Sequence, residues 1–213
     1  MSDYIITVDR ARVIRVLDDP NGNEKYMNTI KAITRNMATN SELISAAALS
    51  SFQYSELKGN GIASENTLDA VLERLSINRQ KVFSQCMEDF EYANAVIYTD
   101  NLIRFCFEFS GTLFNSEYNV CRQRYVEHTK VDVIRSRMGI RKSTVCAMAA
   151  DEIHLVMMLY AVARCSGTPM ADWNARFGMQ TLRYIITHPE QLMPEERVYI
   201  NFEELKEYAR RRN

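Results

Sequence analysis

Glycine and proline are scarce in this 213-residue chain, with 7 and 4 copies respectively. Such a low content of turn-forming residues disfavours β-sandwiches, long loops and disordered tracts. The chain is instead rich in methionine, alanine, leucine, glutamate and arginine, which are good helix formers. The composition therefore predicts a mainly α fold, a globular bundle of several helices.

The patterns of common catalytic and metal sites are also missing. The sequence has no glycine-rich phosphate loop, nucleophile elbow or Cys-x-x-Cys pair. Asp151, Glu152 and His154 lie close together, but no second cluster completes a metal site, and His154 is expected to be a hydrogen-bonded core residue. We therefore expect no metal and no cofactor, and a protein without catalytic activity is favoured over an enzyme.

Cysteine usage and hydropathy bear on the compartment. The five cysteines are odd in number and too far apart for a zinc knuckle, so buried free thiols in a reducing cytoplasm are expected. No basic segment followed by an apolar run opens the chain, which predicts no secretory signal. The most apolar stretch, residues 153–163, is too short to cross a bilayer. We expect a cytoplasmic (intracellular) protein with no membrane partner.

Apolar residues recur at helical spacing through most of the chain. Helices are predicted over residues 10–17 (with Asp9 as N-cap), 24–38, from 41, 64–75, 77–114, 115–128, 131–138, 142–165 and 172–187. Residues 3–8 and 198–202 are rich in β-formers and predict at most one short terminal β pair. The Lys58–Gly61 break divides an N-terminal helical lobe, residues 1–60, from a main helical domain, residues 61–213; a single domain is an equal alternative.

Residues 132–150 contain two predicted helices with a glycine between them. Ile134 and Met138 are expected to be apolar contacts of the first helix, and Gly139 the turn. The apolar residues after the turn are Ile140, Val145 and Met148. This pattern resembles the helix-turn-helix DNA-binding motif. The resemblance implies a positive φ at the glycine, close packing of the two helices, and a second helix whose first turn faces the major groove.

Positive charge is concentrated around this motif. The chain as a whole has a net charge of −1, so any nucleic-acid contact must come from a local patch. Residues 122–142 contain seven basic residues and only two acidic ones, a local excess of five positive charges. Motif and charge together predict a cytosolic regulator of transcription that binds nucleic acid, with a site made of Arg122, Arg124, Lys130, Arg135, Arg137, Arg141, Lys142, Ser143 and Thr144.

A second interpretation treats residues 142–165 as the core helix of a bundle. Arg135 stands where the motif normally has a small residue, and the helix continues as an apolar run to Ala163. Gly139 is then an ordinary helix C-cap, and Ser143 or Thr144 the following N-cap. This favours a protein-interaction or assembly protein, such as an adaptor, inhibitor or coat-like subunit, that binds a protein partner or self-associates. Its contacts would be exposed aromatics, because Phe105, Phe107 and Phe109 cannot share one helix face.

A third interpretation concerns Arg122 and His128, which lie six residues apart on a predicted helix. That spacing resembles the active-site motif of the helical HEPN ribonucleases. In that family the arginine stabilises phosphate charge and the histidine performs acid–base chemistry. A HEPN-like ribonuclease is therefore the third functional alternative.

Overall fold

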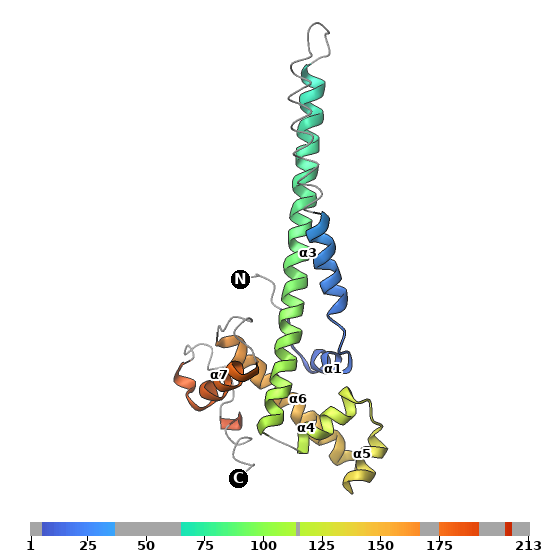
Figure 1. The fold of residues 1–213 in the computed structure, drawn as a ribbon, viewed down its shortest axis with the longest axis vertical. Helices are drawn as coiled ribbons and strands as arrows, with labels where there is room; N and C mark the ends of the chain where they lie inside the picture. Colours follow the sequence, from blue (N-terminus) through green and yellow to red (C-terminus); the bar gives the residue numbers. More distant parts are fainter. Residues whose placement is uncertain (1–5, 37–64, 114–115, 167–174, 192–202, 206–213) are drawn as a thin grey trace. The chain divides into compact units, whose positions relative to one another are not determined.

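The computed structural model describes residues 6–36, 65–113, 116–166, 175–191 and 203–205, and these contain helices but no strand (Figure 1). The mainly α expectation is confirmed. The elements are α1 (Arg10–Asp18), a helix over 24–36, α3 (Glu65–Leu113), α4 (Ser116–Cys121), the π-helix η1 (Arg122–Val126), α5 (Val131–Met138), α6 (Lys142–Cys165), α7 (Ala175–Thr187) and the 3-10 helix η3 (Pro189–Gln191). Of the predicted β pair, residues 6–8 are irregular, and 3–5 and 198–202 lie outside the described residues.

The chain divides into two compact units. The first comprises Met1–Ile5 and Glu24–Ile97, and the second comprises Ile6–Asn23 and Tyr98–Asn213. The boundary that the sequence predicts at residue 60 lies outside the described residues, so it stays a prediction. Every residue of the predicted nucleic-acid site belongs to the second unit.

The first unit pairs the helix over 24–36 with the part of α3 that ends at Ile97. Ala93 and Val96 of α3 are buried, as is Ile33 of the other helix. Tyr26 and Tyr92 meet edge to face, with ring centroids 6.3 Å apart. Apolar burial and an aromatic pair therefore stabilise this unit.

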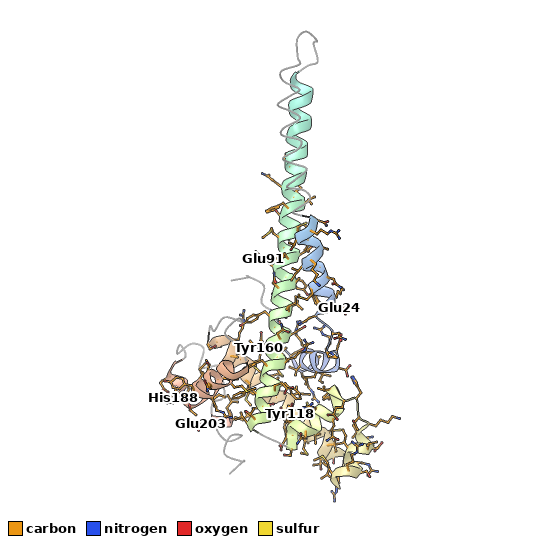
Figure 2. The ribbon with its side chains drawn as sticks, in the orientation of Figure 1. Glu24, Glu91, Tyr118, Tyr160, His188 and Glu203 are labelled. Carbon is orange, nitrogen blue, oxygen red and sulfur yellow. The ribbon has the colours of Figure 1, made fainter. Side chains whose placement is uncertain are left out.

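Helix α6 runs through the core of the second unit. It contacts α1, α4, α5 and α7, and Figure 2 shows the side chains that fill this region, including the labelled Tyr118 and Tyr160. The α6 side chains from Leu155 to Ala163 are largely buried, and each large one contributes about 1.5–3 kcal/mol by leaving water. α6 also has the length and mean hydropathy of a membrane-crossing helix, with 56% of its most apolar window buried inside the protein. Core packing accounts for that apolar character here.

The three aromatic residues Phe105, Phe107 and Phe109 all enter this core. Phe107 and Phe109 are fully buried, and Phe105 is partly buried against the same cluster. Phe107 packs on the ring of Tyr118, with centroids 4.7 Å apart. None of the three is exposed at the surface, because this end of α3 has neighbours on more than one side; the alternative, that one of them meets another chain, stays a prediction.

Candidate nucleic-acid interface

The turn between α5 and α6 is built on Gly139. α5 ends there with φ 65° and ψ 25°, the left-handed conformation that glycine adopts without strain. The Ile140 amide donates to the Arg135 carbonyl at 3.2 Å, which closes the end of α5. Arg141 is extended and α6 begins at Lys142. A Cβ at Gly139 would meet nothing within 4 Å, so the backbone conformation, not lack of space, favours glycine.

α5 packs against α6, and Ile134 of α5 and Val145 of α6 are both fully buried in the shared core. Ile140 and Met148 pack partly against the same core. Met138, expected as a core position, is instead exposed at the surface. Arg135 does not disturb the contact, because its half-exposed guanidinium bonds Asp132 at 3.1 Å on its own helix. The sequence therefore identified the buried pair correctly and misplaced Met138.

The first turn of α6 is solvent-exposed and has no side-chain cap. Arg141, Lys142, Ser143 and Thr144 are all exposed. Ser143 and Thr144 lie in the first turn of α6, next to the expected N-cap region, but the N-cap residue itself is Arg141. The first intrahelical bond runs from the Val145 amide to the Arg141 carbonyl at 3.1 Å. The preceding amides therefore point out of the helix end without an intrahelical acceptor.

After its first turn and as far as His154, α6 has one exposed stripe, and the side chains on its other faces are buried or half-buried. Ser143, Ala147, Asp151 and His154 form this stripe, at helical spacing over three turns. His154 is half exposed, and its Nε2 lies 3.2 Å from a carboxylate oxygen of Glu204, so the expectation of a core histidine is wrong. After His154 no side chain of α6 is exposed, and most of them are buried in the core. α6 thus combines an exposed first part, as expected of a recognition helix, with a largely buried second part, as expected of a core helix.

Four basic side chains on α5, at its start and at the start of α6 are not neutralised by described carboxylates. Lys130, Arg137, Arg141 and Lys142 are exposed, and among the described residues none has a carboxylate oxygen within 4.0 Å. A fifth, Arg124, joins them because its Nη1 donates to the Cys146 sulfur on α6 at 3.6 Å. We call this group the α5–α6 surface: Arg124, Lys130, Arg137, Arg141, Lys142, Ser143 and Thr144.

Two predicted site residues are less available to a ligand. Arg135 is paired with Asp132. Arg122 lies 3.4 Å from the Glu127 carboxylate and donates to the Tyr118 hydroxyl at 3.3 Å. The bond to Tyr118 also raises the pKa of Arg122. The charge of each is balanced locally, so the α5–α6 surface is smaller than the site that the sequence predicts.

Arg122 and His128 do not share a helix. The chain widens into the π-helix η1, in which the Glu127 amide donates to the Arg122 carbonyl at 3.0 Å, and this helix ends at Val126. His128 follows with φ 51°, and its Nδ1 lies 3.3 Å from an Asp18 carboxylate oxygen. Helical structure therefore ends two residues before the predicted end near His128, because the wide turn ends the helical hydrogen bonding there.

The structure also reveals a buried carboxyl group on α6, at one of the three residues weighed above as an incomplete metal site. Glu152 is 1% exposed, and its side chain contacts the Ser110 hydroxyl of α3. Burial raises the pKa of Glu152 to about 7 and the charge of Glu117 raises it further, whereas the hydrogen bond between Glu152 and Ser110 acts in the opposite direction. A glutamate inside a long apolar run was the available sequence signal. Asp151 and His154 lie on the surface instead, and no group of three metal-ligating residues occurs in the described part of the chain.

Comparison with known proteins identifies no family for this chain. The sequence matches no family model, and it has no significant match among curated proteins or solved structures. The charges, exposure and backbone geometry of the α5–α6 surface are therefore the features from which a function can be inferred.

Proposed function

We propose that this protein binds nucleic acid through the α5–α6 surface, as a non-enzymatic, helix-turn-helix-like regulator in the cytoplasm. The observation that carries the proposal is the exposure of Arg137, Arg141 and Lys142 around the uncapped start of α6, with no ion-pair partner among the described residues. Unpaired cations at a surface gain most from a polyanion, because no existing ion pair has to be broken and condensed counterions are released.

Phosphate groups suit this end of α6 for a second reason. The free amides of the first turn donate toward the solvent, and the helix dipole places partial positive charge there. Ser143 and Thr144 add hydroxyl donors next to Lys142. Phosphate contacts of this kind fix the position of a protein on a duplex.

Base recognition would then fall to the exposed stripe of α6. Ser143 and Ala147 are small enough to allow close approach to base edges, and Asp151 offers an acceptor for the amino group of cytosine. The buried remainder of α6 holds this stripe rigidly in the core. A rigid, pre-formed element loses less conformational entropy when it binds.

The test is fluorescence anisotropy with a mixed-sequence DNA duplex over a range of salt concentrations. The variant Arg141→Ala/Lys142→Ala should bind more weakly, and its plot of log K against log salt should be shallower by about 1.8, since each phosphate contact contributes roughly 0.9. Arg122→Ala is the matched control and should bind like wild type, because Arg122 is already engaged by Glu127 and Tyr118. Wild-type protein that fails to bind duplex DNA at low salt rules out this DNA-binding proposal; a parallel titration with RNA identifies the polymer.

A second candidate function, protein assembly, has its own supporting observation in the first unit. Val82 and Phe83 of α3 are 58% and 55% exposed, unusually high for large apolar side chains. Light scattering on the purified chain, with Phe83→Ser as the comparison, tests this function. A monodisperse wild-type monomer that captures no partner in a pull-down counts against assembly.

A further inference from the structure

The Ser110 hydroxyl in the core of the second unit has two oxygen neighbours. Its Oγ lies 2.6 Å from the Phe107 carbonyl oxygen on the same helix, and it also contacts Oε1 of Glu152 on α6. Ser110 is completely buried and Glu152 is 1% exposed. Water therefore does not reach this pair from the surface. Hydrogen bonds among the Ser110 hydroxyl, the Phe107 carbonyl oxygen and the Glu152 carboxyl group must be made with the protons of these groups alone.

Proton counting decides which group donates. A serine hydroxyl has one proton, and a carbonyl oxygen only accepts. If Glu152 were ionised, Ser110 would have to donate to the carboxylate. Its Oγ would then face the Phe107 oxygen at 2.6 Å with no proton between them, which is repulsive. If Glu152 is neutral, its hydroxyl donates to Ser110 and Ser110 donates to Phe107, so each short contact contains one proton.

We propose that Glu152 is held as a neutral carboxylic acid that donates to Ser110, and that loss of this proton loosens the packing of α6 against α3. The second carboxyl oxygen, Oε2, agrees with this state. It is buried and has no hydrogen-bond partner among the described residues. An unpaired carbonyl oxygen of a neutral acid costs far less to bury than an unpaired carboxylate oxygen. The packing of α6 against α3 in the second unit thus depends on the protonation of Glu152, whatever the α5–α6 surface binds.

The surrounding charges favour the neutral form. Glu117 on α4 acts on the Glu152 carboxyl and disfavours a second negative charge. Cys121, also on α4, would be raised in pKa by an ionised Glu152, while Arg124 of η1 acts in the opposite direction on the same thiol. Burial, the Ser110 hydrogen bond and the Glu117 charge are the causes of the shifted pKa of Glu152, and none of them is a cation.

The direction of the pH effect follows from the raised pKa. Below about pH 4.5, the unfolded value, folded and unfolded chains both carry the proton. Between about 4.5 and 7 the unfolded chain releases it while the folded chain keeps it, so rising pH favours unfolding. Above about 7 both forms are ionised and the full penalty is present. The stabilisation therefore exists at low pH and is lost as pH rises through the folded pKa.

The experiment compares urea unfolding of the full chain and of Glu152→Gln across this pH window. The amide of glutamine donates to Ser110 but does not titrate. The ratio of the two unfolding equilibrium constants should change by roughly two to three orders of magnitude in favour of the variant as pH rises. The matched control is Asp151→Asn, an exposed carboxylate one residue away on the same helix, which should leave the wild-type profile unchanged.

A ratio that is constant with pH would overturn the proposal, because it would mean that Glu152 is ionised in the folded protein throughout. Carbon-13 NMR of the Glu152 carboxyl in wild-type protein provides the measurement that does not depend on any variant folding. A midpoint near 7 supports the neutral acid, and a midpoint at or below the ordinary glutamate value refutes it. In Ser110→Ala an upward shift of that midpoint would show that Ser110 had been the donor, which also contradicts the proposal.

Discussion

The Arg12 guanidinium donates two hydrogen bonds to a single carboxylate oxygen of Asp100, from Nη2 at 2.5 Å and from Nε at 3.0 Å. The two side chains are only 12% and 8% exposed, and they join α1 to α3 within the second unit. An ion pair this far from water is costly to break, because removal of one partner leaves the other charged and buried.

Arg12→Ala should therefore lower the free energy of unfolding by about 3 kcal/mol. Urea denaturation followed by circular dichroism measures this. Arg10→Ala, two residues earlier on the exposed side of α1, should change the free energy by less than about 0.5 kcal/mol. Equal effects from the two substitutions would mean that Asp100 is well solvated in the folded protein.

The turn at Gly139 gives a prediction that depends on backbone conformation and not on a side-chain contact. Gly139→Ala should destabilise the protein by about 1–2 kcal/mol, because an L-residue is strained at a φ of 65°. Gly139→Asn should cost less, since asparagine tolerates the left-handed region better than alanine does. Thermal unfolding measures both. A stabilising effect of alanine would contradict a left-handed turn at this position.

Packing between α5 and α6 can be tested at neighbouring valine and isoleucine positions. Ile134→Ala removes a fully buried side chain and should cost about 2–5 kcal/mol. Val133→Ala changes a side chain that is 39% exposed and should cost much less. Chemical denaturation compares the two variants, and similar losses would show that Ile134 is not the contact between the helices.

Cysteine reactivity should separate the thiols into two classes. All five are free; Cys106 and Cys121 are buried, whereas Cys86, Cys146 and Cys165 are half-buried. Burial raises the pKa of Cys106 far above its usual range and that of Cys121 to about 12. A thiol reagent should therefore modify three cysteines in the folded protein and the other two only after unfolding. Rapid modification of all five in native buffer would disprove this division.

The expectation of uniformly buried thiols is only partly right, and the reason is general. Periodicity places Cys106 on the apolar face of a helix, which is enough to predict burial when the rest of that face is also buried. Cys146 shares a helix with buried Val145 and Ala149, yet it faces Arg124 at the edge of the core. Which neighbour covers an intermediate position depends on the packing of separate elements.

The same limit explains the candidate site. Sequence spacing was sufficient for the turn, because a glycine between two apolar stripes has few conformational alternatives. Sequence spacing was insufficient to predict which basic side chains have an ion-pair partner. Arg122 and Arg137 are equivalent in the sequence, but Arg122 meets Glu127 and Tyr118, whereas Arg137 meets no carboxylate among the described residues. The ion-pair and hydrogen-bond partners of long, flexible side chains cannot be predicted from composition.

The sequence by itself determined the helical class, the left-handed turn at Gly139 and the buried pair Ile134 and Val145. These follow from local propensity and from periodicity, which act within a few residues of the chain. Only the tertiary structure decided that Glu152 lies against Ser110, 42 residues away, and that α6 is exposed at its first turn and enclosed at its far end. Solvation of a group depends on the elements that surround it, and those are distant in sequence.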